Sequence, residues 1–453
     1  MPKLDVRLIV PSADSSSFLL AAGGRLASAE LEVDEDAASV VPVSEFLREA
    51  WEFTAPILET HPKWRGVPEG APIPCLALTE PAPADWTVPA GLTFGSDVDT
   101  TELPESIRPR ADELLAEVWT GAPPPPLRPR WARRGWFARA SAWMQRAAAD
   151  AGRPLTGEPR PFFLRGISAL LRAPTDGPDL FLKEVFPPFH AEPVLTQLLA
   201  ERFPTAVPRV IAIDADEGWL ITEDIGSAWV GEVPEPERPA AIGRGAAAIV
   251  AIQRTIAADA DAQRILLAAG APHRPLSELV ASVAASIGPD GMGVGDPLEP
   301  ERAARVLAGV EAAVAAVERV GLPESVVHGD FHSGNAAVVD DRIVIIDWSD
   351  AAISNPAVDV ITWIGWSGDR QDEIDAAIDG WVDAWSTTVD ADALRAAIDD
   401  VKIVGAAYQI VSYDGIRRAL EPATQYTMVG GGEHFLKDLE TILDRREGRD
   451  QPS

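Results

Sequence analysis

Three side chains in the segment from residue 326 to 350 have types and spacing that suit phosphoryl transfer. Asp330 and Asn335 lie five positions apart in a polar loop that contains glycine, and Asp347 follows twelve positions later. In magnesium-dependent phosphoryl transfer, one carboxylate orients an acceptor hydroxyl, while a carboxamide and a second carboxylate hold the metal on the nucleotide phosphates. The alternative is a set of solvated turn residues without a chemical role.

Apolar runs on both sides of this loop predict how the three side chains are positioned. Residues 325–327 and 342–346 are short and apolar, which is typical of buried strands. Such strands would hold the loop between them and would place Asp347 at the end of the second strand.

The composition limits the classes of protein to consider. With 453 residues, 46% of them hydrophobic, the chain should form two or three globular domains. A net charge of −31 argues against a nucleic-acid partner, because the phosphates of nucleic acid would be repelled. The single cysteine, Cys75, excludes an internal disulfide. We find no signal-peptide pattern and no apolar run of about 18 residues, so we expect a cytoplasmic protein without a membrane span.

The sequence pattern changes along the chain and predicts four regions. Residues 1–125 mix short strands with a helix, which indicates an α/β accessory domain. Residues 126–158 contain the end of a proline-rich linker and a basic, tryptophan-rich helix, which we expect to pack against the protein itself rather than on a membrane. Residues 159–226 carry dense strand signals around one helix, and residues 227–453 are largely helical.

Charged residues in the third region have unusual positions. Lys183 lies in an apolar strand, and only five of the 39 basic residues are lysines. It is either an edge-strand charge or a cation that contacts nucleotide phosphates. The helix that follows carries Glu192 in its first turn and Glu201 near its end, and either glutamate could pair with this lysine. We prefer Glu192.

The order of these parts resembles the aminoglycoside phosphotransferase family, the small-molecule branch of the protein-kinase-like fold. The sequence HGDFHSGN at 328–335 resembles the catalytic loop of that family, and IIDW at 345–348 resembles its metal-binding segment. The resemblance implies an α+β, bilobal kinase-like fold. Residues 159–226 would form its β-rich N-lobe and residues 227–453 its helical C-lobe, preceded by the α/β accessory domain.

The resemblance also implies a role for each polar residue of the loop. Asp330 would be the catalytic residue and would act on the proton of the acceptor hydroxyl. Asn335 and Asp347 would bind Mg²⁺, which bridges the phosphates of ATP. His328 would keep the loop in shape, and Asp359 would brace its backbone from the start of a helix.

The same resemblance implies a nucleotide site built from the third region. Lys183 would contact the ATP phosphates and would be positioned by Glu192. The backbone from Glu223 to Ile225 would hydrogen-bond the adenine edge. The chain departs from protein kinases in the loop over the phosphates, where residues 165–168 supply one glycine in place of G-x-G-x-x-G.

The acceptor is expected to be small. Asp359 follows Asp347 by only twelve positions, which leaves no room for the activation segment on which protein kinases bind their substrates. His332 and Asp350 either face the acceptor or serve as capping and surface groups. The acidic charge of the chain favours a cationic acceptor, or it simply solvates the surface.

We therefore expect an ATP-dependent phosphotransferase that moves the γ-phosphate to a hydroxyl of a small molecule. The candidates are an aminoglycoside, an amino sugar, another sugar or an amino alcohol. A nucleotide-binding regulatory or scaffold protein of the same fold is the alternative. The sequence leaves open the choice between ATP and GTP, the role of the accessory domain and the oligomeric state.

The accessory region resembles the Nudix hydrolase family in the order of its parts. A strand is followed by a glycine pair at 23–24, an acidic loop, and a helix with Arg48 and Glu49. Glu52 also fits, but Phe53 stands where a metal-binding glutamate is expected, and the closing glycine of the motif is absent. The resemblance implies a degenerate domain that keeps the fold without the hydrolase chemistry. An unrelated α/β domain is the alternative.

Overall fold

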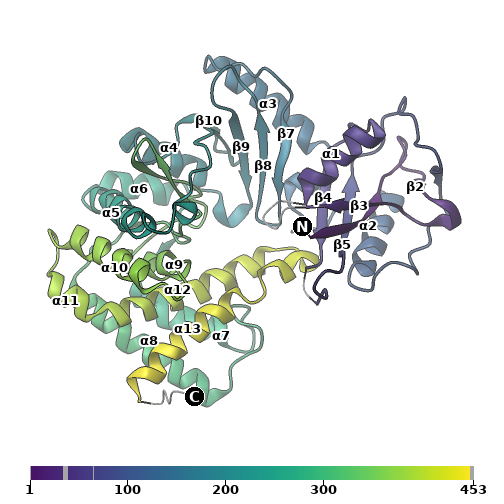
Figure 1. The fold of residues 1–453 in the computed structure, drawn as a ribbon. Coiled ribbons are helices and arrows are strands. Elements are labelled where there is room, and N and C mark those ends of the chain that lie inside the picture. The colour runs from purple at the N-terminus through teal and green to yellow at the C-terminus, as the bar shows by residue number, and fades with distance from the viewer. Residues whose placement is uncertain (1, 34–38, 65, 449–453) are drawn as a thin grey trace. The chain divides into compact units, whose positions relative to one another are not determined.

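A computed structural model describes residues 2–33, 39–64 and 66–448 of the protein (Figure 1). The chain divides into two compact units. Unit 1 comprises residues 1–186 together with 421–424, and unit 2 comprises residues 187–420 and 425–453. The four regions expected from the sequence stay a prediction.

Unit 1 combines strands and helices. Its elements are β1 (Lys3–Ile9), β2 (Phe18–Leu20), β3 (Ala27–Glu32), α1 (Val40–Trp51), β4 (Ile57–Pro62), β5 (Ile73–Thr79), β6 (Thr93–Gly95), α2 (Arg108–Thr120), α3 (Trp136–Asp150), β7 (Arg160–Leu164), β8 (Ser168–Ala173) and β9 (Leu180–Val185). The sheet β3-β1-β5-β4 is mixed, because β1 is parallel to β5 while the outer pairs are antiparallel. β7, β8 and β9 form an antiparallel meander.

Alternation of side chains along β1 shows why the mixed sheet forms. Leu4, Val6 and Leu8 are buried. Asp5 and Arg7 are partly exposed and pair with each other, with 2.9 Å between Oδ2 and Nη2. Successive strand residues point to opposite faces, so one face of β1 enters the core and the other remains polar.

The helix that carries the Nudix-like pattern is α1. Phe53 is buried, and its ring centroid lies 4.8 Å from that of Trp86, so this position belongs to the core. Glu49 and Glu52 are exposed. In the described part of the chain, no group of three or more His, Cys, Asp or Glu residues is arranged to hold a metal ion. The acidic loop falls largely on residues 34–38, outside the described residues, and the Nudix resemblance stays a prediction.

The basic helix expected after the proline-rich linker is α3, and it packs within unit 1. Trp136 is buried, and its indole N–H donates to the carboxylate of Glu184. The same carboxylate is fully buried in β9 and accepts from Arg130 Nε at 2.7 Å. Lys183 is the neighbour of Glu184 in β9, so it points to the opposite face of the meander.

A buried cluster of charges lies inside unit 1. Glu59 accepts from Arg110 Nη2 at 2.8 Å, and its other oxygen lies 2.7 Å from His61 Nε2. Glu421 accepts from Arg110 Nη1 at 3.0 Å and from Arg128 Nε at 2.7 Å. Burial alone would raise the pKa of Glu59, but His61 and Arg110 hold that pKa well below its usual range. The ionised form of Glu59 therefore stabilises the folded state.

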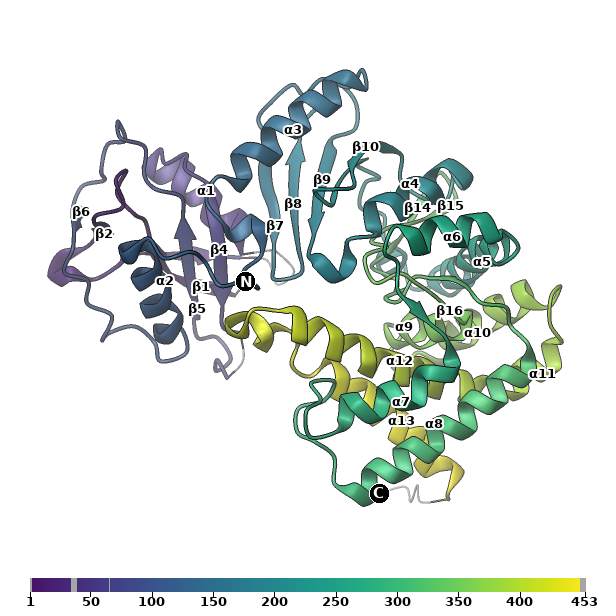
Figure 2. The ribbon, with the colours of Figure 1, turned by 180° about the vertical axis from the view of Figure 1, so that it is seen from behind.

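Unit 2 is largely helical, with short strands around residues 325–354. Its elements are α4 (Glu192–Arg202), β10 (Val210–Asp214), β11 (Trp219–Glu223), α5 (Arg238–Ala257), α6 (Ala260–Ala268), β12 (His273–Arg274), α7 (Leu276–Ile287), α8 (Pro300–Val320), β13 (Ser325–Val327), β14 (Ala336–Val339), β15 (Arg342–Ile345), β16 (Ala352–Ser354), α9 (Val360–Gly365), α10 (Gln371–Trp385), α11 (Ala391–Ala396), α12 (Ile398–Ala419) and α13 (Gly431–Arg446). Helix α12 packs against α7, α8, α9 and α13, and α5 packs against α10 and β13 (Figures 1 and 2).

The short strands of unit 2 hold the segment that the sequence singles out. The two predicted strands are β13 and β15, and β13 pairs with β16. The strand β14, which the sequence does not predict, pairs with β15 as an antiparallel hairpin. Asp340 and Asp341 at its turn have φ of 48° and 63°, as in the mirror-image turn that suits a two-residue hairpin. This hairpin leads directly from Asn335 to Asp347.

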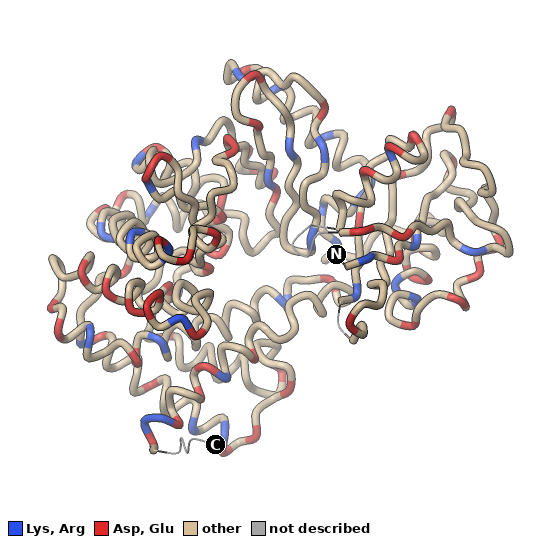
Figure 3. Tube along the Cα trace, in the orientation of Figure 1, with Lys and Arg blue, Asp and Glu red and all other residues tan. Residues whose placement is uncertain are grey.

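Charge is distributed broadly along the chain. Acidic positions occur in many helices and loops of both units, and basic positions lie among them (Figure 3). Within the described residues, no helix is both long enough and apolar enough to cross a membrane.

We predict that Glu59→Gln destabilises the protein in a pH-dependent way. Near neutral pH the substitution removes the carboxylate that His61 and Arg110 share and leaves Arg110 with Glu421 as its remaining buried partner, and it should lower the free energy of unfolding by about 3–5 kcal/mol. Because the folded-state pKa of Glu59 is depressed, its contribution is present above the unfolded value of about 4.3 and is lost as the pH falls. Denaturant unfolding at neutral and acidic pH should therefore show the gap between variant and wild type closing in acid.

Glu30, which pairs with Lys3 at the surface, provides the matched control. Glu30→Gln should change the free energy of unfolding little at either pH, because exposed ion pairs contribute little. Equal losses for the two variants, or a loss for Glu59→Gln that does not depend on pH, would contradict the role given to the buried cluster.

Candidate active site

The loop after β13 is held by a buried carboxylate. Asp359 accepts the backbone N–H of His328 at 2.9 Å and that of Gly329 at 2.8 Å, one on each oxygen. The side-chain amide of Gln253 donates to Oδ2 of the same carboxylate at 2.8 Å. Burial raises the pKa of Asp359 to about 6, although the three hydrogen bonds oppose the rise. Asp359 thus fixes the backbone at the start of the loop.

His328 links the loop to the end of β15. Its imidazole is buried, and Nδ1 accepts the backbone N–H of Asp330 at 3.3 Å. Nε2 lies 2.9 Å from the carbonyl oxygen of Ile346. Because Nδ1 accepts, the proton of the neutral ring resides on Nε2 and is donated to that carbonyl. The imidazole therefore holds this loop beside the residue that precedes Asp347.

Gly329 has a backbone conformation and a close contact that exclude other residues. Its φ is 82°, and a Cβ atom here would lie 2.3 Å from the backbone oxygen of Asp350. The side chain of Gln409 donates to the carbonyl of Gly329. Only glycine combines a left-handed conformation with such a close approach of another backbone.

Asn335 is oriented by hydrogen bonds within the loop. Its Nδ2 donates to the backbone oxygen of Asp330 at 3.0 Å. Its backbone N–H donates to the carbonyl of His332 at 2.8 Å, and its own carbonyl accepts from Ile346 at 2.9 Å. Because the amide nitrogen is engaged by the loop, Oδ1 is the atom of this side chain that can bind a cation.

Asp347 follows β15 in a left-handed conformation, with φ of 61°. Outside glycine this conformation costs about 1–3 kcal/mol and is found at functional sites, where the surrounding structure enforces it. The next residue, Trp348, is buried, and its ring centroid lies 4.8 Å from that of His328. Ser349 donates its hydroxyl to Oδ1 of Asp347 at 2.5 Å. These contacts hold Asp347 in place at the end of the β14–β15 hairpin.

The carboxyl of Asp330 lies among other carboxylates. Its side chain is 51% exposed, yet the protein around it partly desolvates the group. This desolvation, together with repulsion from Asp350, Asp347 and Asp359, raises the pKa of Asp330 to about 7. A cation bound beside these groups would relieve the repulsion and favour the ionised form of Asp330.

The donor set of this segment fits a magnesium ion. Oδ1 of Asn335 and the carboxylate of Asp347 are hard oxygen ligands, and Mg²⁺ is commonly held by one or two carboxylates together with substrate phosphates and water. The described residues contain no cluster of three His, Cys, Asp or Glu residues that would enclose an ion. A metal at this position would therefore take further ligands from its substrate.

The residues predicted to contact the nucleotide phosphates occupy both units. Lys183 is half-buried in β9 of unit 1, and Glu192 is buried in the first turn of α4 in unit 2. Glu201 is exposed near the end of α4 and accepts from Gln197 at 3.1 Å. The two glutamates thus differ in burial, and the pairing of Lys183 with Glu192 stays a prediction.

The residues predicted to meet the adenine edge begin with Glu223, the last residue of β11. The backbone N–H of Glu223 donates to the backbone carbonyl of Arg209 at 3.0 Å, and the Glu223 carboxylate accepts from Arg209 Nη1 at 3.2 Å. Ile225 is half-buried, and the turn around it is closed by the N–H of Gly226, which donates to Asp224 at 2.8 Å. A short turn thus follows β11 at the residues that the sequence predicts to meet the adenine edge.

His332 and Asp350, whose roles the sequence leaves open, both lie near Asp330. Nε2 of His332 is 3.7 Å from Oδ2 of Asp330. Asp350 accepts from Ser412 Oγ at 3.1 Å and contributes to the raised pKa of Asp330. Both side chains therefore belong to the site rather than to a remote surface.

Sequence reasoning does not find Gln253, Gln409 and Ser412, which come from α5 and α12. All three are buried and hydrogen-bond the loop or its neighbours. Isolated polar residues in alanine-rich helices form no local motif. The sequence signal for such a residue is a polar side chain on the apolar face of a helix, because a buried polar group needs a hydrogen-bond partner.

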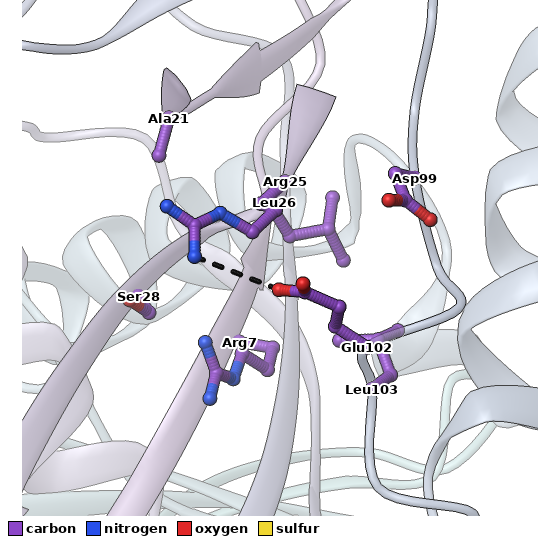
Figure 4. A pocket seen from close by; sticks show the side chains of 8 residues that line it. All are labelled: Arg7, Ala21, Arg25, Leu26, Ser28, Asp99, Glu102 and Leu103. Atoms are coloured by element: carbon purple, nitrogen blue, oxygen red, sulfur yellow. Dashed lines mark ion pairs between the residues drawn. The ribbon is translucent and has the colours of Figure 1, made fainter. Parts of the chain in front are cut away.

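Unit 1 has a small pocket of its own (Figure 4). It is lined by Arg7, Ala21, Arg25, Leu26, Ser28, Asp99, Glu102 and Leu103. Arg25 pairs with Glu102 at 3.5 Å, and Arg7 pairs with Asp5 at 2.9 Å. The cations of this pocket are already compensated by carboxylates, so we assign it no ligand.

The family model described as the phosphotransferase enzyme family matches residues 166–397, which are 232 of the 453 residues. The chain belongs to this family. The resemblance stated for residues 328–335 and 345–348 is thereby confirmed, as are the α+β class and the kinase-like fold.

Several solved structures are similar to this chain. A choline/ethanolamine kinase family protein from Mesorhizobium loti is 16% identical with a TM-score of 0.47, covering 68% of this chain and 94% of its own. A macrolide 2′-phosphotransferase from Brachybacterium faecium is 18% identical with a TM-score of 0.41, covering 62% and 98%. An aminoglycoside phosphotransferase in complex with ADP and hygromycin B is 14% identical with a TM-score of 0.44, covering 68% and 100%. The search of curated proteins gives no match.

We predict that Gly329→Ala destabilises the protein more than Gly321→Ala. The two glycines have nearly the same φ, 82° and 80°, so alanine is strained equally at both. Open space surrounds Gly321, whereas a Cβ at Gly329 meets the Asp350 backbone oxygen. The free energy of unfolding should therefore fall by about 1–3 kcal/mol more for Gly329→Ala, as denaturant titration would measure. Equal losses would show that the close approach does not constrain the loop.

Proposed function

We propose that the protein transfers the γ-phosphate of ATP to a hydroxyl of a small molecule. The observation that carries this proposal is that one loop and the hairpin after it carry Asp330, Asn335 and Asp347. Asp359 fixes the backbone of this loop by accepting two of its N–H groups. The chain's family supports phosphoryl transfer as the reaction class. Phosphoryl transfer needs positioning and charge neutralisation more than covalent chemistry, and this segment supplies the groups for both.

Asp330 is the catalytic residue in this proposal. Its carboxylate accepts a hydrogen bond from the acceptor hydroxyl, orients the oxygen toward the γ-phosphorus, and takes the proton as the new P–O bond forms. The bond from the γ-phosphorus to the β–γ bridging oxygen breaks in the same transfer, and ADP leaves with that bonding electron pair. Asn335 and Asp347 hold Mg²⁺, which when bound neutralises charge on the phosphates. The hydrogen bond from Nδ2 of Asn335 to the Asp330 carbonyl couples the position of the metal ligand to that of the base. His328 and Asp359 keep the loop in the required shape.

The nucleotide is bound in this proposal by residues upstream of the loop. Lys183 contacts the phosphates and is positioned by Glu192, whose burial makes it the better partner. The backbone from Glu223 to Ile225 meets the adenine edge. ATP is the proposed donor.

The acceptor is a small hydroxylated molecule, with aminoglycosides, amino sugars, other sugars and amino alcohols as candidates. The short passage from Asp347 to Asp359, which holds only β16 and a single 3-10 turn at Pro356–Asp359, supports a small acceptor. The absence of a nucleic-acid partner and a cytoplasmic location stay predictions.

We predict that Asp330→Asn abolishes transfer while nucleotide binding remains. Removal of the base should lower kcat by about 10²–10⁴-fold, because general-base catalysis contributes that much. ³¹P NMR of mixtures with ATP, Mg²⁺ and each acceptor class would detect a new phosphomonoester with the wild type, and titration of ADP would show unchanged affinity in the variant. Asp340→Asn makes the same change of charge at the exposed hairpin turn and should retain activity.

Two outcomes would contradict the proposal. Turnover by Asp330→Asn at the wild-type rate would exclude the assigned base. Nucleotide binding without phosphate transfer to any acceptor would favour a nucleotide-binding regulatory or scaffold protein.

We predict that Glu192→Gln and Glu201→Gln have different effects on the use of ATP. A lost hydrogen bond to a charged partner is worth about 1.5–3 kcal/mol, so kcat/KM for ATP should fall by about 10- to 100-fold in Glu192→Gln. Glu201→Gln should stay close to wild type. Steady-state kinetics with varied ATP measure both variants, and the reverse order would assign the lysine partner to Glu201.

A further inference from the structure

The aromatic residues near the C-terminal helices separate into core and surface. Trp363, Trp381, Trp385 and Tyr408 are buried and serve packing. Trp366 is 59% exposed, the highest value for a large hydrophobic side chain in the described part of the chain. An exposed indole offers a flat apolar face together with a polar N–H edge to a ligand.

One face of the Trp366 indole is already covered by the loop. The rings of Trp366 and His332 are stacked, with centroids 4.2 Å apart and planes inclined by 2°. Nδ1 of His332 accepts the backbone N–H of Gly334 at 3.1 Å, and its Nε2 lies 3.7 Å from Oδ2 of Asp330. The imidazole therefore connects the indole to the proposed base.

The backbone around Trp366 is fixed independently of its side chain. Trp366 is the C-cap that follows α9, and its carbonyl accepts from Arg370 Nη2 at 2.9 Å. Arg370 in turn donates to the buried carboxylate of Glu373 at 2.6 Å. The backbone is thus held by Arg370 and the indole by its stack on His332, while Trp366 as a whole stays 59% exposed.

Polar groups stand beside this aromatic surface. Asp350 accepts from Ser412 Oγ at 3.1 Å, and its charge contributes to the raised pKa of Asp330. Burial, together with the charges of Asp330 and Asp350, raises the pKa of Tyr413 to about 12. The Tyr413 ring packs against Gly431, where a Cβ would lie 2.0 Å from a ring carbon, so part of this ring is covered.

We propose that the exposed indole of Trp366 binds a pyranose ring of the acceptor, with Asp350 accepting hydrogen bonds from its hydroxyl or amino groups. This inference rests on the proposed phosphotransferase function. A pyranose has an apolar C–H face that matches a single indole face, while its polar edge suits the carboxylates. A small quaternary ammonium is instead held by a cage of several aromatic faces, and the partly covered Tyr413 ring does not complete one.

Kinetics of Trp366 variants with glucosamine and kanamycin as pyranose probes test this proposal. Trp366→Ala should raise KM for these acceptors about tenfold, the value of an aromatic stacking contact, while KM for ATP stays unchanged. Trp366→Phe keeps a flat ring and should recover most of the affinity. Trp119 is 49% exposed and also has one aromatic neighbour, Phe18, so Trp119→Ala in unit 1 is the matched control and should leave both KM values unchanged.

A binding readout separates this inference from the proposed function. Saturation transfer from the protein to the ring C–H protons of glucosamine, in the presence of ADP, should be seen with wild type and Asp330→Asn and lost with Trp366→Ala. The proposal is overturned if Trp366→Ala has wild-type acceptor KM and saturation transfer. It is also overturned if choline and ethanolamine are phosphorylated while the pyranoses are inert, a result that would leave the phosphotransferase function intact. Pyranose binding at Trp366 without any phosphate transfer would support this site and contradict the function.

Discussion

The hydrogen bonds that Asp359 accepts from the loop are the constraint on which the site depends. A carboxylate this deeply buried is costly unless its oxygens are satisfied, and here two backbone N–H groups and the amide of Gln253 satisfy them. The two backbone donors belong to consecutive residues, His328 and Gly329. Their shared acceptor therefore sets the direction in which the chain leaves β13, and so the position of Asp330.

The remainder of the site follows from that fixed turn. The chain can enter it only with glycine at 329, because the backbone of Asp350 passes too close for a side chain. His328 then reaches the carbonyl of Ile346 and sets the loop beside the hairpin end that carries Asp347. The strained φ of Asp347 is maintained by the buried Trp348 that follows it. The buried contacts of the loop backbone thus fix the positions of the partly exposed carboxylates, although the repulsion between these carboxylates is unfavourable.

That repulsion is a reason to expect a cation. Asp347, Asp350 and Asp359 each contribute by repulsion to the raised pKa of Asp330. A divalent ion shared between protein oxygens and phosphates would relieve this repulsion. The proposed reaction, in which a metal ion binds together with the nucleotide, would supply such an ion.

The sequence predicts the parts of this site that are local and misses those that are not. The spacing of Asp330, Asn335 and Asp347 is readable because one loop and one hairpin carry all three, between apolar runs that behave as strands. Strand β14 is missed because two of its four residues are alanine, which has little preference for strands. Gln253 is 106 positions from Asp359, and Glu421 is 311 positions from Arg110, so only the folded chain brings these partners together.

The sequence also does not predict which of the tryptophans near the proposed acceptor site is exposed. Tryptophans at 363 and 366 are near neighbours in sequence, yet one is buried and the other exposed. Helical periodicity does not separate them, since α9 is short and ends at Gly365, one residue before Trp366. The stack with His332 depends on the loop conformation, which Asp359 determines from another element.

The position of the metal tests the central claim most directly. A crystal structure with Mg²⁺ and a non-hydrolysable ATP analogue should place the ion about 2.1 Å from Oδ1 of Asn335 and from a carboxylate oxygen of Asp347, with phosphate oxygens completing its shell. An ion bound to the nucleotide but away from both side chains would contradict the account.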